Sequence, residues 1–166
     1  MTLQVAEAYK EVIQSMHIPC QLLALDALPQ AAISDAIYRK KEHAMEDFGH
    51  SLFDTADEFI IVMPEYNGSF PGILKLVIDS CNPEIFKQKR FALVGVSSGR
   101  AGNLRGMDHL TDILHYLKAE VYSQKLPISS IHALINSDRK LIDKPSLLTI
   151  EAHINGFLAY LGVMKH

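Results

Sequence analysis

The sequence predicts an α/β fold in which a parallel sheet is covered by helices on both faces. Three observations support this class: helical and strand patterns alternate along the chain, the clearest strands are continuous apolar runs, and loops containing Gly and Ser follow two of these runs. With 166 residues, 48% of them hydrophobic and 21% charged, the chain is long enough to bury a substantial core. We therefore expect a single domain over residues 1–166.

The first half of the chain predicts a helix, a strand, a connection and a second strand. Residues 2–15 have the apolar spacing of a helix, and residues 19–25 are predicted to form a strand. Residues 28–48 are expected to form a connection with a charged helical stretch at 39–42. Residues 58–63 are predicted to form a strand, because residues 59–63 are a continuous apolar run rich in β-branched residues, which is typical of a strand buried on both faces.

The second half continues the alternation of helices and strands. The predicted elements are a helix that follows residue 70, a strand at 90–96, a helix at 103–118, a short strand at 120–123, an irregular segment at 127–143 and a helix at 145–161. Each helix has apolar residues at helical spacing. These residues are Ile73, Leu74, Val77, Ile78 and Cys81 in the first, Met107, Leu110, Leu114 and Leu117 in the second, and Leu147, Ile150, Ile154, Phe157, Leu158 and Leu161 in the third.

The loop Pro-Glu-Tyr-Asn-Gly-Ser, residues 64–69, is the most informative segment of the chain. Pro64 ends the strand before it, and Asn67-Gly68 is a turn signal. Ser69 is the expected N-cap of a helix whose first turn contains Pro71. Because the loop follows the carboxyl end of a parallel strand, it lies where open α/β sheets bind ligands.

The stretch from Phe59 to Asp79 resembles the flavin-ring loop of the NADPH-dependent FMN reductase family, which includes flavodoxin-like quinone, chromate and azo-dye reductases. The match joins the six loop residues to a Pro-Gly-x-Leu-Lys helix start. It implies a flavodoxin-like fold with FMN and NADPH or NADH as cofactors, and a quinone or similar small molecule as electron acceptor. It also implies a homodimer or homotetramer, to which the aromatic residues Tyr66 and Phe70 at the loop tip would contribute.

A second loop, Ser97-Ser-Gly-Arg-Ala-Gly-Asn103, follows the strand at 90–96 and resembles the segment that approaches the flavin from the other side in this family. The residues implied to contact FMN are Pro64, Glu65, Tyr66, Asn67, Gly68, Ser98, Gly99 and Arg100. Backbone N–H groups of Asn67 and Gly68 would bond the pyrimidine end of the ring. Arg100, where many members have a small residue, would either stabilise the reduced flavin or remain a solvated cation. Glu65 would serve either the flavin or a subunit contact.

This resemblance explains why the sequence contains no catalytic triad or pair of catalytic carboxylates. Hydride would pass from nicotinamide to flavin and electrons onward to the acceptor, so the cofactor carries the chemistry and the protein supplies orientation and electrostatics. Three histidine and carboxylate positions, His43, Glu46 and His50, have helical spacing, but a solvated face is the expected reading and no metal site is predicted. Cys20 and Cys81 are expected to be buried free thiols.

The start of the sequence departs from the family pattern. Residues 2–6, Thr-Leu-Gln-Val-Ala, resemble the start of the family's first helix, which normally follows a strand and a phosphate-binding loop. Neither precedes it here, so the expected sheet lacks its first strand. A start assigned too late, a truncated chain and a shortened paralogue are the three explanations, and we favour the first two over the third.

The composition and charge of the chain bear on its function, its location and its binding partners. The net charge of −3 and the scattered Lys and Arg do not indicate a nucleic-acid surface. No membrane-length apolar run or leader pattern occurs, which favours a cytoplasmic protein. A non-catalytic flavodoxin-like binding or assembly module remains the main alternative to a reductase. A one-electron flavodoxin carrier ranks last, because such carriers are usually strongly acidic.

Overall fold

The computed structural model describes residues 1–38 and 44–163. Within these residues the sheet has four strands, β1 (Glu58–Pro64), β2 (Arg90–Val96), β3 (Glu120–Val121) and β4 (Leu126–Ile128), which pair in parallel. β1 pairs with β2 along its whole length, while β3 and β4 pair with the first and last residues of β2 on its other edge. The predicted α/β fold with a parallel sheet is confirmed.

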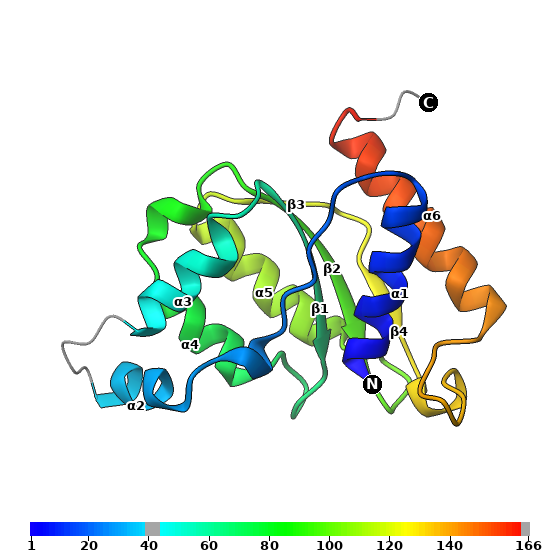
Figure 1. Cartoon of the computed structure of the whole chain (residues 1–166), viewed down its shortest axis with the longest axis horizontal. Helices are drawn as coiled ribbons and strands as arrows, with labels where there is room; N and C mark the ends of the chain where they lie inside the picture. Colours follow the sequence, from blue (N-terminus) through cyan, green and yellow to red (C-terminus); the bar gives the residue numbers. More distant parts are fainter. Residues whose placement is uncertain (39–43, 164–166) are drawn as a thin grey trace.

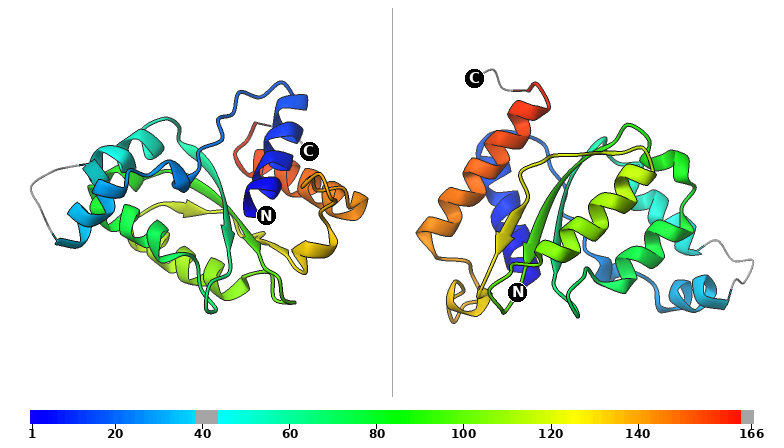
Figure 2. Two further views of the ribbon diagram at one scale, coloured as in Figure 1. Left: turned by 60° about the horizontal axis from the view of Figure 1, so that its bottom comes forward. Right: turned by 180° about the vertical axis from the view of Figure 1, so that it is seen from behind.

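Helices cover both faces of this sheet (Figure 1). One layer contains α3 (Ala44–Phe53), α4 (Gly72–Ser80) and α5 (Leu104–Tyr116), with α2 (Gln30–Tyr38) packed against α3. The other contains α1 (Thr2–Ser15) and α6 (Lys144–Tyr160), which pack against each other. Figure 2 shows the same two layers from below and from behind. Short 3-10 helices, η1 (Leu25–Ala27), η2 (Pro83–Phe86) and η3 (Ile131–Ala133), complete the chain.

The continuous apolar run of β1 is explained by these two layers. Successive side chains of a strand point to opposite faces. Phe59, Ile61 and Met63 therefore join the core beneath α3, α4 and α5, whereas Ile60 and Val62 join the core beneath α1 and α6. A strand that alternated apolar and polar residues would leave one of these layers without a partner.

The segment at residues 19–25 is not a strand, contrary to the sequence prediction. It runs without regular secondary structure from the end of α1 to η1. Between it and β1 lies an apolar groove of about 1140 Å³, lined by residues of α1, this segment, β1 and α6. Arg90 N donates to Asp57 O, and Glu65 N donates to Val96 O. The backbone N–H and C=O groups of the odd-numbered residues of β1 therefore point toward β2. The backbone groups of Ile60 and Val62 therefore face the groove.

Several smaller differences follow from local chemistry. The helix α4 begins at Gly72 with Pro71 as its N-cap, so Ser69 does not cap it. The segment predicted to be irregular, residues 127–143, contains η3 and most of β4. β4 was not predicted because Pro127 lacks a backbone N–H donor and is unfavourable within a strand. The strand predicted at residues 120–123 is limited to 120 and 121. The charged stretch predicted at 39–42 lies outside the described residues.

Candidate functional site

Two loops lie side by side at the carboxyl edge of the sheet, at the bottom of the view in Figure 1. The β1–α4 loop (residues 65–71) begins where Glu65 N donates to Val96 O at 2.9 Å. The β2–α5 loop (residues 97–103) begins where Ser97 N donates to Ile128 O at 2.9 Å. Parallel pairing thus brings together the two segments that the sequence predicted as one site. Their contacts with a flavin remain a prediction.

The tip of the β1–α4 loop is a tight hairpin turn. Tyr66 N donates to Ser69 O at 2.9 Å and Ser69 N donates to Tyr66 O at 3.0 Å. The two residues between them have positive φ, 52° at Asn67 and 76° at Gly68, as a type I′ turn requires. Neither of their backbone N–H groups has a hydrogen-bond partner within the described residues. Tyr66 is 61% exposed beside them.

The β2–α5 loop is fixed by its own serines. Ser97 Oγ donates to Gly99 O at 2.9 Å and accepts from Gly102 N at 3.0 Å. Ser129 Oγ donates to Arg100 O at 2.7 Å, which ties the loop to the segment after β4. The side chains of Ser98 and Arg100 are exposed, and Ser98 Oγ forms a hydrogen bond of 3.0 Å with His132 Nε2. The backbone at Ser98, Gly99 and Arg100 is therefore held in place while its outer surface stays open.

Asn103, which the sequence analysis did not select, connects the two loops. Its side chain is fully buried, and its Nδ2 donates to Pro64 O at 2.8 Å and to Met63 O at 3.4 Å. Its backbone N donates to Glu65 Oε2 at 3.3 Å. Sequence alone offers one weak signal for this role, an Asn directly after Gly102 and before a helix. That pattern normally indicates an N-cap, yet the Asn103 side chain makes no capping hydrogen bond.

Two side chains of α5, the cation Arg105 and the imidazole of His109, lie beside the β1–α4 loop. The Arg105 guanidinium lies beside Gly68, since a Cβ added at Gly68 would be 3.6 Å from one of its terminal nitrogens. One turn further along α5, His109 Nδ1 forms a hydrogen bond of 3.0 Å with Ser69 Oγ. Arg100, Arg105 and His109 are all exposed. The arrangement suits a ligand with anionic groups or one that gains negative charge.

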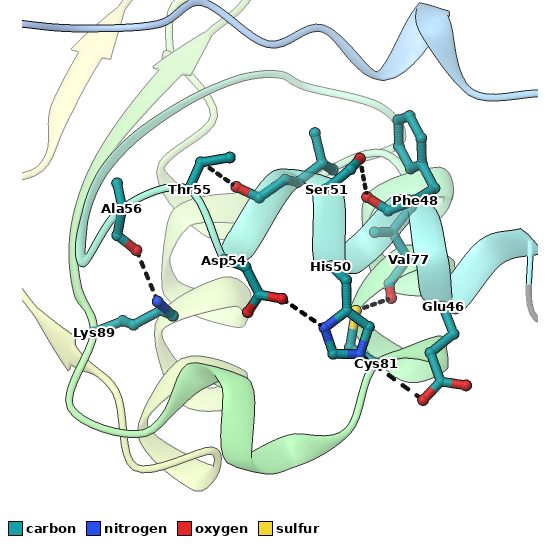
Figure 3. Close-up of polar contacts among 11 residues, drawn as sticks. Glu46, Phe48, His50, Ser51, Asp54, Thr55, Ala56, Val77, Cys81 and Lys89 are labelled. Carbon is teal, nitrogen blue, oxygen red and sulfur yellow. Dashed lines mark hydrogen bonds and ion pairs between the residues drawn. The ribbon is translucent and has the colours of Figure 1, made fainter.

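The histidine and carboxylate cluster on α3 lies away from these loops. Figure 3 shows His50 between Glu46 and Asp54, with Nδ1 at 2.9 Å from Asp54 and Nε2 at 4.0 Å from Glu46. His43 lies outside the described residues. Within the described part of the chain no three His, Cys, Asp or Glu side chains gather as metal ligands.

Both cysteines are free thiols. Cys81 is buried behind the α3 cluster, and burial raises the pKa of its thiol to about 11, so it remains protonated. Cys20 is half-buried, with its Sγ 3.9 Å from Lys10 O. The expectation of buried free thiols is therefore confirmed for Cys81, while Cys20 keeps part of its surface exposed.

The strongest buried polar contact outside the site joins α1 to α6. His153 Nε2 donates to Gln124 O at 2.8 Å, so Nδ1 accepts the hydrogen bond of 2.8 Å from the Tyr9 hydroxyl. Burial lowers the pKa of His153 and raises the pKa of Tyr9, which keeps both groups neutral. This histidine was not singled out in the sequence, where it falls among the apolar positions of the last helix.

The chain is similar in sequence to a known family of flavin enzymes. Residues 1–133 match the NADPH-dependent FMN reductase family. An NAD(P)H-dependent FMN reductase of Pseudomonas aeruginosa is 36% identical over 126 residues, which are 74% of this chain and 68% of that protein. A 2-hydroxy-1,4-benzoquinone reductase of a Burkholderia species is 25% identical over 111 residues, 64% of this chain and 61% of the relative.

The fold is shared with a solved flavoenzyme. FerB, an NAD(P)H:(acceptor) oxidoreductase of Paracoccus denitrificans, superposes with a TM-score of 0.74 at 19% identity, covering 98% of this chain and 90% of FerB. None of the described helices combines the length and apolar character needed to cross a membrane. The sequence match over most of the chain and the shared parallel α/β architecture lead to one conclusion: this chain belongs to the NADPH-dependent FMN reductase family.

Proposed function

We propose that the chain binds FMN between the β1–α4 and β2–α5 loops and acts as an NAD(P)H-dependent oxidoreductase on a quinone or similar small acceptor. The observation that carries the proposal is the turn at Asn67 and Gly68 at the carboxyl edge of a parallel sheet, whose two backbone N–H groups have no hydrogen-bond partner among the residues that the structure describes. Bound FMN would accept hydride from nicotinamide and deliver electrons to the acceptor.

The residues at this edge fit a flat, polar-edged ring. The N–H groups of Asn67 and Gly68 would donate to oxygens and nitrogens at the pyrimidine end of the flavin. Small residues at Ser98 and Gly99 let the backbone approach the ring closely. Tyr66 is exposed next to the turn and can pack against the ring or a bound substrate. Pro64 and Glu65 hold the start of the loop.

The cationic residues have a defined place in this proposal. Reduced flavin carries negative charge, and nearby cationic side chains stabilise that charge. Arg100 is exposed on the β2–α5 loop and Arg105 lies beside Gly68. Arg105 was not among the residues predicted from sequence, because it falls in the helix after the loop.

We also propose a homodimer or homotetramer and a single domain over residues 1–166. Tyr66 supports an interface near the flavin, being 61% exposed at the loop tip. Phe70, the second aromatic residue expected to contribute, is only 9% exposed and packs in the core instead. The case for a shared site therefore depends on Tyr66.

A non-catalytic flavodoxin-like binding module is the second candidate. The observation that favours it is the edge of β1 beside the apolar groove, which pairs with no other strand among the described residues. A one-electron carrier would bind FMN but would not oxidise NADPH at a useful rate.

Steady-state turnover separates these functions. Purified protein supplied with FMN is mixed with NADPH or NADH and a benzoquinone, and loss of absorbance at the nicotinamide band is followed. We expect saturable oxidation that depends on both protein and quinone. Arg105→Gln should raise KM or lower kcat, whereas Lys87→Gln, at an exposed ion pair with Glu84 far from the loops, should leave turnover unchanged. Flavin binding without oxidation would favour the carrier, and no flavin binding would favour the module.

A further inference from the structure

We propose that Asn103 is a positioning residue that sets the spacing of the two loops and thereby the affinity and redox potential of the bound flavin. The inference rests on the proposed function, because it assigns a role within the same site. It concerns a residue that would act through Pro64, Glu65 and the turn beyond them rather than by touching the flavin.

Among the described residues, the hydrogen bonds that Asn103 donates lead to the end of β1 and the start of the β1–α4 loop. Its Nδ2 holds the carbonyl of Pro64, the last residue of β1, at 2.8 Å and the preceding carbonyl of Met63 at 3.4 Å. Its backbone N–H holds the Glu65 carboxylate at 3.3 Å. Asn103 itself ends the β2–α5 loop. One side chain therefore fixes where both loops leave the sheet.

The surroundings are shaped to admit this amide. Gly95 in β2 has no side chain, and a Cβ there would lie 2.9 Å from Asn103 Cβ and would overlap the carbonyl of Gly102. Gly106 in α5 also lacks a side chain, and a Cβ there would overlap Asn103 Oδ1. Two glycines in regular elements, where glycine is unfavourable, thus leave room for the Asn103 amide.

Stability alone does not account for this residue. The Oδ1 atom of Asn103 is buried without a hydrogen-bond partner among the described residues. A buried oxygen without a hydrogen bond is destabilising. Asn103 also adopts a left-handed backbone with φ of 60°, which asparagine tolerates better than most residues. The unsatisfied oxygen is therefore a cost that the two hydrogen bonds of Nδ2 must offset, and it indicates that the amide is retained for the loop position that it imposes.

Asn103 would affect the flavin through the residues that connect Pro64 to the turn. Asn67 and Gly68, whose free N–H groups are proposed to contact the ring, lie three and four residues after Pro64. A change in the orientation of Pro64 and Glu65 moves these donors, and a shift of well under 1 Å weakens a hydrogen bond to the ring. The strength of those bonds influences how well the protein stabilises the reduced flavin, and hence its potential.

The test uses Asn103→Gly in the full chain. Glycine accepts the left-handed backbone without strain, so this variant removes the amide and leaves the local conformation available. We expect the dissociation constant for FMN to rise at least tenfold, together with a changed visible circular dichroism spectrum and a shifted midpoint potential of the bound flavin. His153→Gln, in the buried contact between α1 and α6, is the control: it should lower thermal stability and leave the flavin potential unchanged.

A second variant protects the test against a folding failure. Gly106→Ala keeps Asn103 but places a methyl group against its Oδ1 and 2.8 Å from Phe70 N, so it should displace both Asn103 and the end of the β1–α4 loop. It should therefore weaken FMN binding and shift the potential in the same direction. If wild-type protein fails to bind FMN, both the proposed function and this role are wrong. If wild-type protein binds FMN and either folded variant matches its affinity and potential, the positioning role alone is wrong.

Discussion

At the scale of single residues, the protonation of the buried imidazole of His153 opposes folding. His153 is held neutral between the Tyr9 hydroxyl and the Gln124 carbonyl, and burial lowers its pKa in the folded state. The unfolded chain therefore binds a proton more readily than the folded chain. Above the ordinary histidine pKa of about 6.5 the full contribution of this contact is present. As pH falls below that value, the contribution is lost.

We predict that stability falls between pH 7.5 and pH 5.5 and that His153 causes part of the fall. Urea unfolding at both pH values measures it. His153→Gln should be less stable at pH 7.5 and should show a smaller loss on acidification. Equal pH dependence in the wild type and His153→Gln would contradict the assignment.

A second prediction at this scale concerns the turn at the site. Gly68 has φ of 76°, whereas Gly72 begins α4 with no atoms within 4 Å of an added Cβ. Gly68→Ala should cost about 1 kcal/mol of unfolding free energy through backbone strain. It should also weaken FMN binding, because the turn must reorient. Gly72→Ala is the matched control and should be neutral or slightly stabilising, since alanine favours a helix. Chemical denaturation and flavin titration measure both effects, and a Gly68→Ala protein as stable as Gly72→Ala would refute the strain argument.

At the scale of elements, α3 and α4 approach each other through a glycine. A Cβ at Gly49 would overlap Cys81 Sγ and lie 3.8 Å from Val77 Cγ1. From the sequence Gly49 looked like a weak point in a helical stretch, but in the fold its missing side chain is what permits the contact. Helix propensity and packing therefore make opposite predictions for alanine at this position.

We predict that packing decides the outcome. Alanine would favour the helix by about 1 kcal/mol relative to glycine, whereas overpacking of a filled core costs about 1–3 kcal/mol. Gly49→Ala should therefore lower the unfolding free energy. Cys81→Ala removes the overlapping sulfur, so the double variant should recover most of the loss attributable to Gly49→Ala, as a double-mutant cycle measures. Additive effects of the two substitutions would show that the sulfur is not the obstacle.

The elements that the sequence predicted well are those with an unambiguous period. α1 spans residues 2–15 and β2 spans residues 90–96, as expected, because each has a clear apolar pattern and a turn signal at its end. The segment at residues 19–25 is apolar enough for a strand, but in the fold the groove separates it from the edge of β1. Whether a segment reaches a strand edge is a property of the tertiary fold. For β4 the opposite holds. Pro127 disfavours a strand in the local sequence, but pairing with β2 in the tertiary fold forms one.

The site was predictable as two loops but not as a connected unit. Local patterns identified both loops, and parallel topology predicted that they would meet. The connection through Asn103 depends on a buried amide that reaches from the start of α5 to the end of β1, 39 residues away from Pro64 in the sequence. Arg105 and His109 reach the turn from α5 in the same way. Contacts of this kind require three-dimensional placement of the helix.

At the scale of the whole molecule, β2 organises the fold. It is buried along nearly its whole length, pairs with β1, β3 and β4, and brings both loops to one edge of the sheet. The two helical layers bury separate cores on its faces. β1 has interior-strand character, apolar on both faces, yet its free edge borders the groove of about 1140 Å³. The two loops therefore extend from a well-buried strand, and β1 beside it borders the groove.

The most direct test of the account is the visible absorbance of the purified full chain, as isolated and after incubation with FMN and desalting. We predict retained flavin at close to one equivalent per chain, with an absorbance spectrum shifted from that of free FMN. Circular dichroism on the same sample establishes that the protein is folded. A folded protein that remains colourless after FMN addition and desalting would contradict the central claim that the two loops form a flavin site.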